Sequence, residues 1–198
     1  DGQLNSQDYK SISTLISHRV LYKISEGTRD SAAIRQVSNS LFEEFEGNLK
    51  CHLNLISVDL QTNNIIISRN NSVPVFLVTD ETVDCLTSDS ESIGWKKDIR
   101  LSIVELPIRP GMAIIAISDG VYLAGRKNKL NPDFSVSIEA IFEDQEPTAQ
   151  EVADSLLNRA IRLDEDRPKD DMSVVVMLIS PESTDQIRRM NFSISLDN

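Results

Sequence analysis

Residues 112–120 read Met-Ala-Ile-Ile-Ala-Ile-Ser-Asp-Gly, and this stretch decides the fold. Its first six side chains are apolar without alternation, which is typical of a strand buried on both faces of a sheet. The strand should end at Ser118-Asp119-Gly120, where polar residues and glycine begin. A second run of this kind, Ser-Val-Val-Val-Met-Leu-Ile at 173–179, comes directly after Asp170-Asp171. We expect both runs to be doubly buried strands.

Acidic residues stand where the first of these strands ends and the second begins. If the two strands pair antiparallel, Asp119 and Asp170 meet at one rim of the sheet. Carboxylates packed so closely repel, so we expect either protonation or a cation between them. Oxygen ligands with no Cys or His nearby suit magnesium, manganese or calcium. An ordinary Asp-Gly turn and a solvated Asp170-Asp171 loop would also explain these residues, and the residues alone leave both interpretations open.

The rest of the pattern predicts helices first, then strands, then one helix and a strand. Apolar steps of three and four predict helices over 9–24 and from about Asp30 to Gly47, and Thr148 with Glu151 forms the capping-box pattern that opens another helix. Strands are predicted at 50–59 and 65–69, which form a hairpin, and at 73–78 and 100–106, and alternating apolar residues at 192–196 predict an extra edge strand. Pro74 places the strand at 73–78 toward a sheet edge or a bulge. This order indicates an α+β fold.

Composition excludes several classes of protein. The chain has 198 residues, of which 31 are Asp or Glu and 20 are Lys or Arg, for a formal charge of −11. This acidic balance argues against nucleic-acid binding, and no apolar run is long enough for membrane insertion. Two cysteines are too few for a secreted disulfide scaffold. We expect a soluble, cytoplasmic protein.

An ordered series of short motifs resembles the metal-dependent protein phosphatases, the PPM family. The series is Asp1-Gly2, Ser118-Asp119-Gly120 and Asp170-Asp171-Met172-Ser173. The resemblance is greatest to the bacterial branch of stage II sporulation E and sigma-factor regulator phosphatases. Three further segments are similar in order and spacing, namely the hairpin around 58–67, Ser92-Ile93-Gly94 and the stretch 106–112.

The resemblance implies a fold, a metal site and a reaction. The fold would be a four-layer α/β/β/α sandwich of two mainly antiparallel sheets with helices outside. Asp1 would bridge two Mn²⁺ or Mg²⁺ ions, the Gly2 carbonyl would ligate one of them, and Asp119 and Asp170 would hold one ion, with Asp171 as a possible supporting residue. A metal-activated water would then hydrolyse phosphoserine or phosphothreonine on a signalling phosphoprotein, with an anti-sigma-factor antagonist as one candidate.

The sequence also departs from the family pattern. Leu4-Asn5-Ser6 stands where the branch has Gly-His-Gly, and 70–74 differs from its Ala-Gly-His-Pro-Pro loop. The strands that precede the first Asp-Gly in the family are absent. We therefore expect residues 1–198 to be a single PPM-type domain from a longer chain, without its N-terminal strands. A catalytically weak or inactive module that binds a regulatory partner is the alternative, and a calcium- or magnesium-stabilised structural domain is a third.

Overall fold

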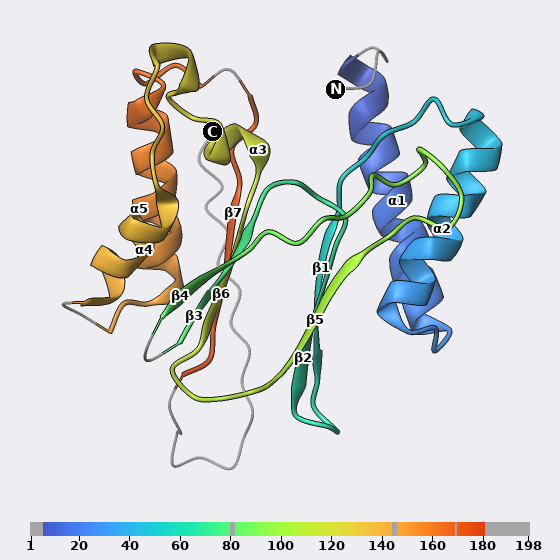
Figure 1. Cartoon of the computed structure of the whole chain (residues 1–198), viewed down its shortest axis with the longest axis horizontal. Coiled ribbons are helices and arrows are strands. Elements are labelled where there is room, and N and C mark those ends of the chain that lie inside the picture. Colours follow the sequence, from blue (N-terminus) through green and yellow to red (C-terminus); the bar gives the residue numbers. More distant parts are fainter. Residues whose placement is uncertain (1–5, 80–81, 144–145, 169, 181–198) are drawn as a thin grey trace. The chain divides into compact units, whose positions relative to one another are not determined.

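The computed structural model describes residues 6–79, 82–143, 146–168 and 170–180. The chain divides into two compact units, each with its own antiparallel sheet (Figure 1). Unit 1 consists of Asp1–Ser72 and Ser88–Ile108, and unit 2 of Val73–Thr87 and Arg109–Asn198. Two mainly antiparallel sheets accompanied by helices confirm the predicted α+β class.

Unit 1 packs two helices against a three-stranded sheet. The helices are α1 (Ser6–Ser25) and α2 (Asp30–Phe45), and the strands are β1 (Asn54–Asp59), β2 (Asn64–Arg69) and β5 (Ser102–Pro107), in the order β1-β2-β5. Apolar residues four apart, such as Ile12 and Ile16, line the buried face of α1. They pack in one cluster with Leu41 of α2 and Leu55 of β1, so the helices cover one face of this sheet (Figure 1).

Unit 2 contains a four-stranded sheet in the order β4-β3-β6-β7, with every neighbouring pair antiparallel. The strands are β3 (Val75–Val78), β4 (Val83–Leu86), β6 (Ala113–Ile117) and β7 (Val174–Leu178). The helices are α3 (Asp119–Tyr122), α4 (Phe134–Glu143) and α5 (Ala149–Leu163), with a 3-10 turn, η1, at Arg126–Asn128. Ile115 of β6 packs with Ile138 of α4 and Leu156 of α5 in a single core, all three fully buried.

The helix α5 begins with the capping box that the sequence predicts. Thr148 Oγ1 accepts a hydrogen bond from Glu151 N at 3.2 Å, and Glu151 Oε2 accepts one from Thr148 N at 2.8 Å. The bonds from the Thr148 backbone and side chain lower the pKa of the Glu151 carboxyl. Each of these two side chains therefore satisfies the backbone N–H of the other residue. This reciprocal pair fixes where the helix starts.

Replacing Thr148 by Ala should lower the free energy of unfolding by about 1 kcal/mol at neutral pH, because an N-cap oxygen is lost. Since the folded-state pKa of Glu151 is lowered, its contribution is present above the unfolded pKa and disappears as the pH falls through the folded value. The difference in the free energy of unfolding between the wild type and the Thr148→Ala variant should therefore become smaller at acidic pH. Urea unfolding at neutral and acidic pH measures it, and Thr148→Ser, which keeps the hydroxyl, should match the wild type.

Three strands differ from expectation. The strand after Pro74 is not at an edge: β3 lies between β4 and β6, because the proline comes just before the strand and so removes no ladder hydrogen bond. Between the predicted strands at 73–78 and 100–106 the structure contains a further strand, β4, for which no prediction was made. The run 174–178 forms β7, but within the described sheet it is an edge strand and Val175 is 60% exposed, so it is not doubly buried. The predicted strand at 192–196 lies outside the described residues.

Candidate metal centre

The pairing of β6 with β7 brings two acid-bearing loops together in unit 2. Ile117, at the end of β6, is in register with Val174, at the start of β7, and Ser118 N donates to Ser173 O at 2.9 Å. The predicted antiparallel pairing is therefore correct. It places Asp119 and Asp170 beyond the same end of two hydrogen-bonded strands.

Ser118 joins the two loops through its side chain. Its hydroxyl donates to the carbonyl of Asp171 at 3.1 Å and accepts from the N–H of Ser173 at 3.0 Å. A serine hydroxyl can donate and accept at the same time, and Ser118 uses both roles to hold the 171–173 backbone. The loop that carries Asp170 and Asp171 is thus fixed to the end of β6 at two points.

Gly120 allows the loops to approach more closely than any other residue would. A Cβ at this position would lie 2.4 Å from the carbonyl oxygen of Asp171 and 3.3 Å from Cβ of Asp170. The first distance is impossible for a real side chain, so glycine is required here by the close approach of backbone. The residue next to Asp119 therefore lies against the backbone of the loop that carries Asp170 and Asp171.

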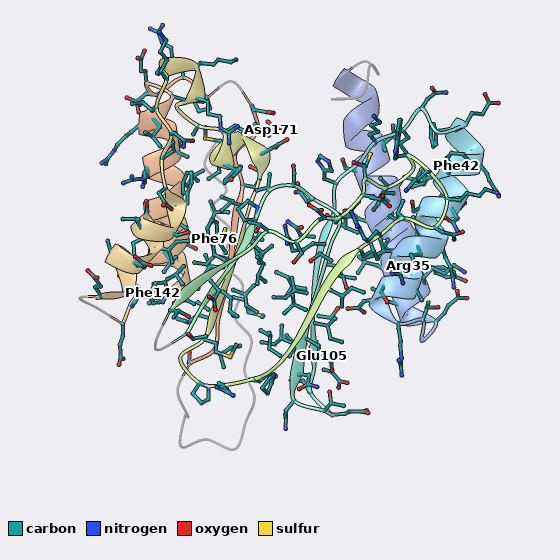
Figure 2. The ribbon with its side chains drawn as sticks, in the orientation of Figure 1. Arg35, Phe42, Phe76, Glu105, Phe142 and Asp171 are labelled. Carbon is teal, nitrogen blue, oxygen red and sulfur yellow. The ribbon has the colours of Figure 1, made fainter. Side chains whose placement is uncertain are left out.

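The carboxylates themselves are turned toward solvent and are bonded only locally. Asp119 Oδ1 accepts from Gly120 N at 3.0 Å, and Asp170 Oδ1 accepts from Asp171 N at 2.9 Å. All three aspartates are exposed, and Figure 2 shows Asp171 beside α3. In the described part of the chain, the ion pairs all belong to unit 1, and none involves these aspartates.

Charge is distributed unevenly between the units. Unit 2 carries 19 Asp and Glu against 10 Lys and Arg, a net charge of −9, whereas unit 1 carries 12 against 10, a net charge of −2. Carboxylates carried by two loops that lie against each other, in so acidic a surrounding, favour a bound cation. An all-oxygen donor set suits a hard divalent ion, so the residues present fit Mg²⁺ or Mn²⁺.

The structure does not complete a ligand set from these residues. Among the described residues, no three acidic, His or Cys side chains converge closely enough to hold a metal ion. Asp1 and Gly2, the other expected ligands, lie outside the described residues. The interpretation of Asp119 and Asp170 as ligands therefore stays a prediction. The sequence analysis did not identify the roles of Ser118 and Gly120, for which the only sequence signal was the order Ser-Asp-Gly.

Comparison with known proteins assigns the chain to a family. The family model described as stage II sporulation protein E (SpoIIE) matches residues 12–180. The chain belongs to this SpoIIE family. Stage II sporulation protein E of Priestia megaterium is 27% identical over 179 residues, covering 89% of this chain and 30% of that protein. The Bacillus subtilis protein is 27% identical over 163 residues, covering 81% of the chain and 19% of that protein. The chain thus spans less than a third of either relative.

Solved structures show the fold of this SpoIIE-family chain. The PP2C phosphatase domain of B. subtilis SpoIIE with a fragment of its regulatory domain matches with a TM-score of 0.75 at 22% identity, covering 91% of this chain and 52% of that one. The serine/threonine phosphatase PstP/Ppp of Mycobacterium tuberculosis matches with a TM-score of 0.61 at 17% identity, covering 85% and 83%. The chain therefore has the PPM fold, and the expected resemblance is confirmed. No helix in the described ranges is both long and apolar enough to cross a membrane.

Proposed function

We propose that this domain is a metal-dependent serine/threonine phosphatase that acts on a signalling phosphoprotein. The observation that supports it is the juxtaposition of the Asp119 and Asp170 loops by β6–β7 pairing, in a chain whose family and fold are those of phosphatases. The matched structures include a SpoIIE phosphatase domain presoaked with Mn and RsbX in complex with magnesium. Divalent metal use by relatives agrees with the carboxylates found here.

In this proposal Asp119 and Asp170 hold one Mn²⁺ or Mg²⁺ ion, Asp1 and the Gly2 carbonyl contribute to a two-ion centre, and Asp171 supports it. Such ions, when bound, lower the pKa of a water and neutralise phosphoryl oxygens. The chain's own part is to keep the two loops fixed. Ser118 and Gly120 do so through backbone contacts, so that little reorganisation accompanies substrate binding.

Electrostatics explains why a phosphatase of this composition needs a cation. A phosphate ester is an anion, and unit 2 has a net charge of −9. Bare carboxylates at the rim would repel the substrate. Asp119 and Asp170 would hold a divalent cation that neutralises their two negative charges, and a phosphoryl group would then no longer be repelled from this rim.

The substrate class that we propose is a phosphorylated protein of a bacterial signalling pathway in the cytoplasm, with an anti-sigma-factor antagonist as one candidate. Relatives support this choice in general terms, because the matched structures include SpoIIE, described as a cell fate determinant, and RsbX. The alternative is a module that binds a regulatory partner without useful turnover. It is favoured by the departure from the family pattern at Leu4-Asn5-Ser6, where the branch has Gly-His-Gly.

Hydrolysis of an aryl phosphate and of a phosphoserine peptide should depend on added Mn²⁺ and stop with chelator. Calorimetric titration with Mn²⁺ should be run on the same preparation, because it distinguishes the alternatives. Binding of Mn²⁺ without turnover would support the partner-binding module, and the absence of binding would contradict a metal centre altogether. Asp154→Asn, which removes a remote carboxylate on α5 and keeps the oxygen that Gln150 contacts, is the matched control and should leave turnover unchanged.

A further inference from the structure

Unit 2 contains a second feature, a cavity at the end of the sheet opposite Asp119 and Asp170. It has a volume of about 660 Å³ and lies where β3 ends, β6 begins and β7 ends. Its apolar wall is formed by Val78, Val83, Phe142 and Leu178. Figure 2 shows Phe142 at the end of α4, away from Asp171 beside α3. A volume of this size can bury several side chains of a bound segment.

Glutamates surround this apolar wall. Glu139 and Glu143 of α4 and Glu146 after it line the cavity, and all three are exposed. Glu139 and Glu143 are four residues apart on one helix, a spacing at which like charges destabilise the helix. The described part of the chain provides no Lys or Arg in an ion pair with any of the three. The cavity is therefore suited to an apolar segment that carries positive charge.

The chain leaves the sheet at the wall of this cavity. Ile179, which lines it, donates its N–H to Met112 O and accepts from Gly111 N, both at 2.8 Å. The segment 181–198 begins two positions after Ile179. Arg188 lies nine residues beyond Ile179, and an extended chain covers roughly 30 Å over that length. The segment can therefore turn back and reach the glutamates.

The sequence of this segment complements the cavity. Arg188-Arg189 provides two adjacent positive charges, and Phe192, Ile194 and Leu196 alternate with serines. In an extended conformation the three apolar side chains would lie on one face. We propose that segment 181–198 docks in the cavity of its own chain, with the apolar side chains against the wall and with Arg188, which shares their face in an extended conformation, paired to Glu139 or Glu143.

The docking can be tested in the full chain by replacing Phe192 with the photo-crosslinker p-benzoylphenylalanine. Irradiation should link it, within the monomer, to peptides that contain Val83 or Phe142. The same group at Ser193, on the opposite face of an extended segment, should react at this site much less. Arg188→Glu with Arg189→Glu should reduce the yield about fivefold, as expected for the loss of exposed ion pairs. Adding Glu139→Arg with Glu143→Arg should restore it.

A matched pair of variants tests whether the crosslinking yield depends on the glutamates of the cavity or only on the net charge of unit 2. Glu139→Gln with Glu143→Gln should lower the yield, whereas Asp154→Asn with Glu165→Gln removes the same charge elsewhere in unit 2 and should not. Crosslinked dimers would show that the cavity receives the segment of a second copy and would overturn the proposal. Links to the outer edge of β7 or to unit 1, or equal yields from positions 192 and 193, would overturn it as well. None of these readouts depends on phosphatase activity.

Discussion

Replacing Asp119 by Asn should abolish the stabilisation of the protein by Mn²⁺ and reduce phosphatase turnover by at least about 100-fold, because even groups that only support a metal ligand are worth 10–100-fold. The metal-free protein should be as stable as the wild type or slightly more so. Asn keeps the oxygen that accepts from Gly120 N, and it removes the negative charge from one of two loops that lie against each other. The stabilisation lost is about 2.7 kcal/mol when free metal is a hundredfold above its dissociation constant.

Thermal unfolding of both proteins, with Mn²⁺ and with chelator, measures this difference. Asp154→Asn is again the control, because it removes one charge from the exposed face of α5 and should show the full metal-dependent shift. Equal shifts in the wild type and the Asp119 variant would rule out Asp119 as a ligand. If the Asp119 variant were less stable than the wild type in the presence of chelator, Asp119 would instead be an aspartate that stabilises a turn.

Replacing Gly120 by Ala should destabilise the protein by about 2–3 kcal/mol, because the added methyl group overlaps the carbonyl of Asp171 and backbone must move. For a chain of this length, that corresponds to a melting temperature lower by roughly 5–10 °C. The displaced loop carries Asp170, so the shift produced by Mn²⁺ should decrease too. Calorimetry with and without metal gives both quantities.

Gly27→Ala is the control that distinguishes the effect of this contact from the backbone cost of placing alanine at a glycine with positive φ. Gly27 has a φ of +86° and nothing within 4 Å of its Cβ position, so alanine there incurs only the backbone cost of about 1–2 kcal/mol. That variant lies in unit 1 and should keep the complete Mn²⁺ shift. If Gly120→Ala also kept it, the contact between Gly120 and the Asp170 loop would not position a metal ligand.

Local sequence signals predicted much of unit 2. The six apolar residues from Met112 predicted β6, and the capping box predicted where α5 begins, because both depend on residues close together in the chain. The proximity of Asp119 to the 170–171 loop followed from one assumption, antiparallel pairing, which is correct. The resemblance to PPM phosphatases added the family and the fold, which composition alone could not provide.

Features that depend on tertiary packing could not be predicted in this way. β4 escaped detection because Asp84 and Cys85 are exposed, so its short sequence lacks an apolar pattern. The sequence pattern did not predict α4, which lies between Asn131-Pro132 and Glu146-Pro147, although Phe134 and Ile138 form a buried helical stripe. The contact of Gly120 with Asp171 involves residues 51 positions apart, and a single Asp-Gly pair contains no information about it.

The unequal distribution of charge between the units has a consequence for ionic strength. At physiological salt the Debye length is about 8 Å, and exposed charges farther apart than this are largely screened. Added salt weakens the ion pairs of unit 1, such as Arg19 with Glu44 at 2.7 Å, and also weakens the mutual repulsion within unit 2. The same change of buffer therefore acts on the two units in opposite directions. When the unfolding of the whole chain is followed against salt concentration, the free energy of unfolding therefore reflects the difference between weaker ion pairs in unit 1 and weaker repulsion in unit 2.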